Sequence, residues 1–89
     1  AVYLTLVSNI AVAAIEEARL HGQVAATRRI IAIQLDLLRV LRRQHEQGQI
    51  GLPEVVTQET TVAQARLSLA PLERDLAKQR NLLAALVGR

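Results

Sequence analysis

The side chains that could carry out chemistry in this chain are few and scattered. His21 and His45 lie on one predicted helix but far apart, and neither has a Cys or a group of carboxylates beside it. Glu16 and Glu17 form a carboxylate pair. Adjacent residues on an α-helix point about 100° apart, so the two carboxylates cannot share a proton or an ion. We therefore expect no metal site.

The hydroxyl side chains also lack the partners that catalysis needs. Thr60, Thr61 and Ser68 have no base near them in a sensible helical geometry. The chain has no cysteine, which excludes disulfides and thiolate metal sites. A phosphate-binding glycine loop opens a helix after a strand, and no strand is predicted. We expect no enzyme, no catalytic residue and no cofactor.

The charge pattern does not favour nucleic acid. The net charge is +3, and Arg28-Arg29 and Arg42-Arg43 form basic pairs. Eight acidic residues are spread among the basic ones, however, and Tyr3 is the one aromatic residue that could stack on a base. The arginines are better explained as the solvated face of a helix.

The apolar residues suit contacts between helices. They make up 51% of the 89 residues and are almost all Leu, Ala, Val and Ile. The apolar stretch from Ala1 to Ile15 has no basic segment before it and meets Glu16 before the roughly 20 residues that span a bilayer. It therefore indicates a helix and not a signal or membrane segment. Because the pattern is already under way at Ala1, we expect the chain to be part of a longer protein.

Two long helices are predicted, at about 2–47 and about 53–87. Apolar residues alternate at spacings of three and four, which keeps one stripe toward a partner helix. We call the residues of this stripe the seam. In the first helix the seam is Tyr3, Leu6, Ile10, Ala13, Glu17, Leu20, Val24, Thr27, Ile31, Gln34, Leu38, Leu41 and His45. In the second it is Val55, Gln58, Val62, Ala65, Leu69, Leu72, Leu76, Gln79, Leu83 and Leu86.

The seam holds two polar residues that call for an explanation, Glu17 and Gln79. We interpret them as positions that set the register, and keep open that they line a channel or gate. Pro71 lies inside the second helix, where a proline costs about 3 kcal/mol and bends the helix. The seam passes through it unbroken, so we expect a kink near Pro71 and not two helices.

Residues 48–53 form the predicted tip, where the chain turns. Gly48 suits the left-handed conformation that ends a helix, and Pro53 suits the first position of the next. Reversal here gives an all-α, coiled-coil-like antiparallel hairpin. It would place Leu38 opposite the Val62 region and Val24 opposite Leu76, leaving residues 1 to about 11 beyond the shorter helix.

A second apolar stripe lies beside the seam of the first helix. We call it the outer stripe, and it consists of Ile30, Ile33, Leu37 and Val40. A helix with two apolar stripes usually has two neighbours, and one hairpin supplies only one of them. We therefore expect the outer stripe to pack in an oligomer.

Several short motifs, in order, resemble one family. Tyr3-Leu4 with Leu6, Arg43 with Gly48 and Glu54-Val55, Pro71-Leu72-Glu73, and Arg80-Asn81 through Gly88 are similar to the periplasmic helical region of outer membrane efflux proteins. These are the TolC-like outer membrane factors, and the resemblance is to the lipoprotein branch that serves RND-type pumps. Glu54 stands where the family usually has Asp.

The resemblance implies the rest of the expected function. It implies a trimeric channel in a Gram-negative bacterium, whose helices form a periplasmic α-barrel and whose hairpin tip docks a periplasmic adaptor protein that leads to an inner-membrane pump. This fragment would not itself span the membrane. The expected partner-binding residues are Arg43, Gly48, Gln49, Ile50, Gly51, Leu52, Pro53 and Glu54.

Two other interpretations stay open. Periplasmic adaptor proteins also carry a long antiparallel helical hairpin with a glycine at its tip. The run from Leu82 to Arg89 reads as helix followed by a stop and argues against the polar strand that would follow such a hairpin. The other is a free-standing coiled-coil interaction module.

Overall fold

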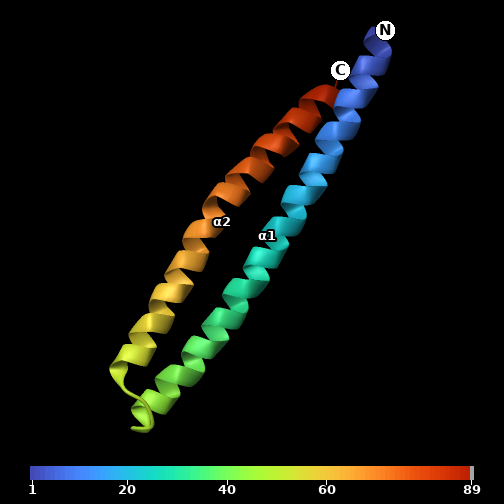
Figure 1. The fold of residues 1–89 in the computed structure, drawn as a ribbon. Coiled ribbons are helices and arrows are strands. Elements are labelled where there is room, and N and C mark those ends of the chain that lie inside the picture. The colour runs from blue at the N-terminus through green and yellow to red at the C-terminus, as the bar shows by residue number, and fades with distance from the viewer. Residues whose placement is uncertain (89) are drawn as a thin grey trace. The chain divides into compact units, whose positions relative to one another are not determined.

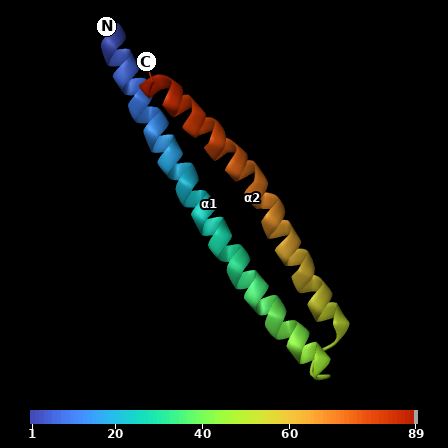
Figure 2. The same ribbon diagram turned by 180° about the vertical axis from the view of Figure 1, so that it is seen from behind.

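The computed structural model describes residues 1–88, which form two α-helices and a short turn. Helix α1 spans Val2–Glu46 and helix α2 spans Leu52–Val87, with no strand among the described residues. Figure 1 and the reverse view in Figure 2 show the chain reversing between the helices, so that α2 runs back beside α1. The predicted all-α helical hairpin is therefore confirmed.

The hairpin divides into two compact units. The turn unit consists of residues 26–69, and the end unit combines residues 1–25 with those from 70 onward. Helix α2 continues without interruption past Pro71, which lies next to the boundary of the units. The proline thus leaves α2 a single helix. The two units are described separately below.

The seam predicted from the sequence is the buried face of both helices. Every buried side chain among residues 1–88 lies at a seam position. In the turn unit these are Ile31, Leu38, Val55, Gln58 and Val62. In the end unit they are Ala13, Leu20, Val24 and Leu76. Alternating spacings of three and four keep these residues on one face over many turns, so burial follows directly from the sequence pattern.

The turn unit has a continuous apolar cluster. Leu38, Val55 and Val62 are 4% exposed each, and partly buried Leu35, Leu41 and Ile50 pack against them. Full burial of such a side chain contributes about 1.5–3 kcal/mol. The predicted meeting of Leu38 with the Val62 region is confirmed.

A buried amide pair joins the helices beside this cluster. The Gln58 side chain is 8% exposed and donates from Nε2 to the Gln34 carbonyl oxygen at 3.0 Å and to Gln34 Oε1 at 2.6 Å. One buried amide thus meets both a backbone and a side-chain acceptor on α1. Both glutamines lie in the predicted seam, but their pairing was not predicted from the sequence.

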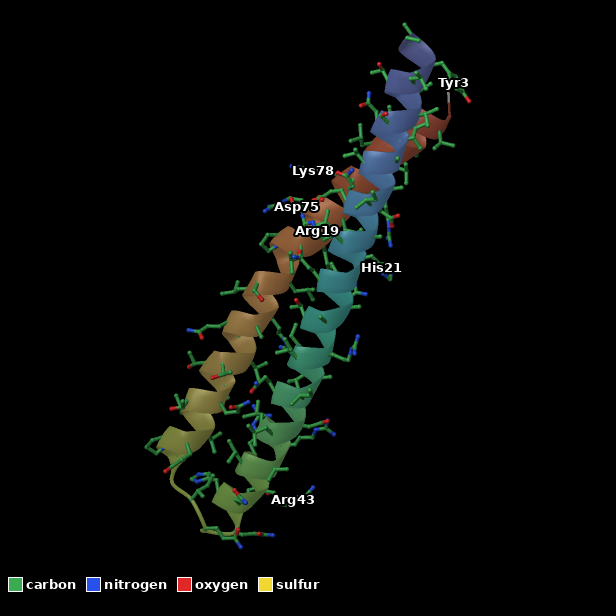
Figure 3. The ribbon with its side chains drawn as sticks, turned by 45° about the vertical axis from the view of Figure 1, so that its right-hand side comes forward. Tyr3, Arg19, His21, Arg43, Asp75 and Lys78 are labelled. Atoms are coloured by element: carbon green, nitrogen blue, oxygen red, sulfur yellow. The ribbon has the colours of Figure 1, made fainter. Side chains whose placement is uncertain are left out.

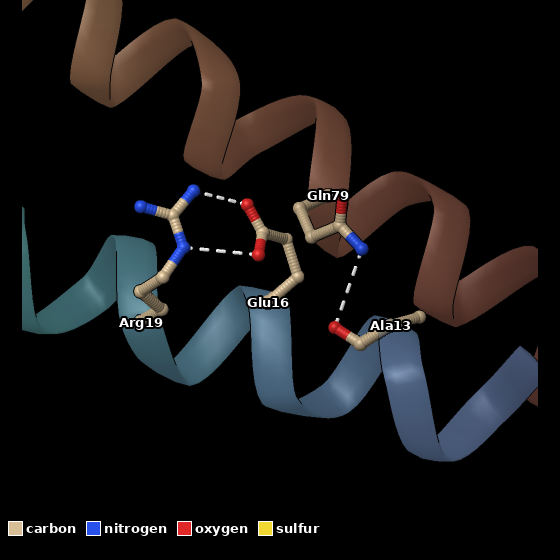
Figure 4. Close-up of polar contacts among 4 residues, drawn as sticks. All are labelled: Ala13, Glu16, Arg19 and Gln79. Atoms are coloured by element: carbon tan, nitrogen blue, oxygen red, sulfur yellow. Dashed lines mark hydrogen bonds and ion pairs between the residues drawn. The ribbon is translucent and has the colours of Figure 1, made fainter.

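In the end unit the two polar seam residues are used in contacts between helices. Gln79 donates from Nε2 to the Ala13 carbonyl oxygen at 3.3 Å, as Figure 4 shows. Arg80 Nε lies 3.3 Å from Glu17 Oε1. A buried polar group is costly unless it is hydrogen-bonded, and both contacts meet that need. They also fit the register-setting interpretation of Glu17 and Gln79.

The predicted alignment at the open end is wrong. Pairing Val24 with Leu76 would bring Gln79 level with His21, whereas Gln79 contacts Ala13. The side chain of Leu86 lines a hollow with the residues Ala1, Val2, Thr5, Leu6 and Asn9 of α1. The overhang is therefore shorter than the expected length of about 11 residues, although Figure 1 shows the first turns of α1 extending past the end of α2. A heptad seam determines which face of each helix is buried. The same faces stay buried when α2 is shifted along α1, so the seam does not determine the size of that shift.

Candidate functional site at the tip of the hairpin

Helix α1 ends in a defined capping structure. Gly48 has φ of 74°, in the left-handed region that glycine adopts without steric cost. Its N–H donates to the His45 carbonyl at 3.0 Å, and the Gln49 N–H donates to the Gln44 carbonyl at 2.8 Å. These two bonds form a Schellman motif, which satisfies the carbonyls left open at the end of a helix. The predicted role of Gly48 as the residue that ends the helix is confirmed.

Helix α2 begins one residue earlier than predicted. Leu52 is its first residue and Pro53 its second, a position at which a missing N–H is still harmless. Gly51 precedes the helix, and a Cβ on it would lie 3.2 Å from Glu54 Oε2 and 3.3 Å from Pro53 Cδ. The Glu54 carboxylate thus lies close to the residue before the helix, where the helix dipole favours negative charge.

Ile50 is partly buried in the turn unit. Its side chain packs against the Leu38–Val55–Val62 cluster. Its carbonyl oxygen lies 3.1 Å from His45 Nδ1. Ile50 is therefore less open to a partner than Leu52, and its docking role stays a prediction. The apolar cluster extends farther toward the turn than the heptad pattern alone indicates.

The exposed apolar surface near the tip is formed by Leu52 and Val56. They are 55% and 50% exposed, and they lie one helical turn apart at the start of α2. Side chains four apart are neighbours on a helix, so these two form one patch. Val56 is absent from the predicted site, although its spacing from Leu52 could have revealed it. A shallow hollow beside the patch is lined by Leu41, Pro53, Glu54, Thr57 and Gln58.

Two charged groups near the tip, Arg43 and Glu54, differ in their position relative to this patch, because Glu54 lies between Leu52 and Val56 in the sequence and Arg43 lies on α1. Arg43 and Glu54 form no ion pair with any residue from 1 to 88, and Figure 3 shows Arg43 near the end of α1, on the side away from α2. By contrast, the neighbouring Arg42 lies 3.8 Å from Glu59 across the helices. A charge of each sign is therefore available to a partner at the tip.

The outer stripe is exposed along its whole length. Ile30 is 51% exposed, Ile33 63%, Leu37 44% and Val40 47%. All four lie on α1 within the turn unit, beside a seam that α2 already covers. The two apolar faces of α1 thus have different surroundings, and only the seam is satisfied within the hairpin.

The end unit carries a separate group of charged side chains. Glu16 and Arg19 form an ion pair one helical turn apart on α1, and Figure 3 shows Asp75 and Lys78 of α2 near Arg19. These four charged residues line one shallow hollow, together with Leu20 and Gln79. The hydrogen bond from Arg19 lowers the pKa of the Glu16 carboxyl, and the carboxylate in turn raises the pKa of Arg19.

The remaining residues singled out for chemistry stay apart. Figure 3 places His21 on the side of α1 away from α2. Across residues 1–88, no group of three or more His, Cys, Asp or Glu side chains could hold a metal ion. Neither α1 nor α2, over the same residues, has a stretch long and apolar enough to cross a membrane.

Comparison with known proteins returns no relative. No family model, no curated protein and no solved structure matches this chain.

Proposed function

We propose that this chain is part of the periplasmic helical tunnel of a TolC-like outer membrane efflux channel. In this proposal the hairpin packs beside further helices of a trimeric α-barrel. Its tip docks a periplasmic adaptor protein and connects the channel, through that adaptor, to an inner-membrane pump. The protein would belong to the outer membrane of a Gram-negative bacterium, with this chain in the periplasm.

The exposed outer stripe is the observation that carries the proposal. Its four aliphatic side chains lie in a row beside a seam that is already complete. Contiguous apolar surface of this kind marks a site of protein contact in a soluble region. An α-barrel supplies such a contact, because each helix then has a neighbour on either side. A free-standing two-helix module leaves the stripe in water.

The tip provides the second line of support. Its backbone is fixed by the Schellman motif, its apolar patch at Leu52 and Val56 is uncovered, and Arg43 and Glu54 are unpaired within residues 1–88. An apolar centre with a polar rim is the usual composition of a protein-binding surface, and Glu54 lies beside the Leu52–Val56 patch.

Two substitutions in the full-length protein test the docking role. Gly48→Leu forces a side chain into a left-handed conformation, and Leu52→Asp places a charge in the apolar patch. We expect both to abolish efflux-dependent drug or metal resistance and crosslinking to the adaptor, while trimers still reach the outer membrane.

Matched controls are available in the same chain. Gly22 is an exposed helical glycine whose Cβ would meet nothing within 4 Å, so Gly22→Leu tests the same change away from the tip. Gln64→Asp adds the same charge on the exposed side of α2. Full resistance and normal adaptor crosslinking in the two tip variants would show that the tip is only a turn.

A further inference from the structure

We propose that His45 is the residue that positions the tip for docking, by a hydrogen bond from its Nδ1–H to the carbonyl oxygen of Ile50. This inference rests on the proposed function for its biological consequence. The position of the proton on the His45 ring can be tested in this chain alone.

The geometry places the ring across the turn. His45 lies in the last turn of α1, seven residues after Leu38, and therefore on the face that points toward α2. Its side chain is nevertheless exposed, because the chain beyond Gly48 has left the helical path. The carbonyl of Ile50 returns to within 3.1 Å of Nδ1. The ring thus joins the end of α1 to the residue just before α2 begins.

The identity of the acceptor determines the tautomer. A backbone carbonyl oxygen can only accept a hydrogen bond, so Nδ1 must carry the proton. In the neutral ring this leaves Nε2 as the unprotonated nitrogen. The opposite tautomer would direct a lone pair at the carbonyl oxygen. The imidazolium also donates from Nδ1, so the contact is present in either charge state of the ring.

Three restraints then hold the tip in one shape. The Schellman bonds fix Gly48 and Gln49, the apolar cluster holds the Ile50 side chain, and His45 holds the Ile50 carbonyl. The last two restraints both act on Ile50, one on its side chain and the other on its carbonyl oxygen. Leu52, which follows Ile50 by two residues, is thereby presented in a defined position. A surface already fixed before binding loses less conformational entropy on docking, so its affinity is higher.

Three substitutions separate the hydrogen bond from the bulk of the side chain. Asn places its Nδ2 donor at the position of His Nδ1, Gln carries its donor one bond farther along, and Leu removes it. We expect His45→Asn to dock the adaptor like the native protein. His45→Gln and His45→Leu should dock about three- to tenfold more weakly, the loss of one hydrogen bond. Equal docking by all three variants would overturn the proposal.

Nitrogen-15 chemical shifts of the imidazole rings in the 89-residue chain show directly which ring nitrogen carries the proton. With both histidines neutral, His45 should show a protonated Nδ1, and amide hydrogen exchange at residues 50–52 should accelerate in His45→Leu but not in His45→Asn. His21 is the internal control, since no hydrogen bond joins its ring to any of residues 1–88. A His45 ring protonated at Nε2 would contradict the inference.

The docking function of the tip and the positioning role of His45 can be tested separately. If His45 is protonated at Nδ1 but Gly48→Leu still docks the adaptor normally, the docking function is wrong and the positioning of the tip stands. If Gly48→Leu abolishes docking while the ring is protonated at Nε2, the docking function stands and His45 is not what positions the tip.

Discussion

The turn unit and the end unit are built from the same two helices but differ in how fully each covers its apolar side chains. In the turn unit, the large exposed aliphatic residues of α1 are confined to the outer stripe, and the seam holds a continuous cluster. In the end unit, large apolar residues are exposed around much of α1. These are Val2, Tyr3, Leu4, Val7, Val12 and Ile15, between 45% and 87% exposed.

The polar contacts between the helices are also tighter and more buried in the turn unit than in the end unit. The turn unit buries its amide pair and ties its loop to the cluster through Ile50. The end unit holds its helices with the longer contacts of Gln79 and Arg80, beside open hollows. Helical stability comes mainly from packing an apolar face. We therefore expect the turn unit to supply more of its own stability than the end unit does.

Truncating one leucine in each unit gives the largest expected effect. Leu38→Ala opens the turn cluster, and we expect a loss of about 4 kcal/mol in the free energy of unfolding. Leu20→Ala should cost only about 2 kcal/mol, since Leu20 borders a hollow that polar side chains and water can fill. Denaturant unfolding followed by circular dichroism at one fixed protein concentration measures both. A larger loss of unfolding free energy for Leu20→Ala would show that the end unit is packed more tightly than the turn unit.

Charges in the outer stripe are expected to act on association and not on folding. We predict that the native chain self-associates, and that Ile33→Glu with Leu37→Glu shifts it toward monomer while the helix content is retained. Ala32→Glu is the control, because Ala32 lies on the side of α1 that carries Asp36 and Arg39. Sedimentation equilibrium measures the change. A native chain that remains a well-folded monomer at high concentration would contradict this prediction.

The amide pair is expected to have a moderate effect in the turn unit. Gln58→Ala removes a buried donor and leaves a gap, at a cost of about 1–3 kcal/mol in unfolding free energy. Replacing Gln34 and Gln58 together by Leu should change stability little but broaden the distribution of oligomers, as loss of a polar seam position does in coiled coils. Thermal unfolding and sedimentation of both variants test this. A double variant with one unchanged oligomeric state would show that the pair does not determine the register.

The seam could be predicted because burial follows a short repeat that is visible in the residues themselves. Gly48 could be predicted for a similar reason, since one local conformation determines where α1 ends. The packing of Ile50, the His45 contact and the Gln34–Gln58 pair could not. Each depends on the axial offset of α2 against α1, which is set by the three-dimensional path of the turn. The same offset explains the error at the open end.

The exposed ion pair of the end unit gives the smallest expected effect. The Arg19 hydrogen bond lowers the pKa of Glu16, so its stabilisation is present above the pKa of an unfolded glutamate and is lost as pH falls through the folded value. The Arg19 and Glu16 side chains are 52% and 39% exposed, and solvent screening keeps the contribution small. Glu16→Gln should therefore lower Tm slightly at neutral pH and leave it unchanged in strong acid. A difference that persists in strong acid would assign the effect to another cause.

Site-specific photocrosslinking in living cells tests the central claim most directly. A photoreactive residue is placed at Leu52 of the tip or at Ile33 of the outer stripe in the full-length protein. The account predicts that Leu52 crosslinks to a periplasmic adaptor protein and that Ile33 crosslinks within the channel trimer. Crosslinks from Ile33 to the adaptor, or none from Leu52 to any adaptor, would contradict it.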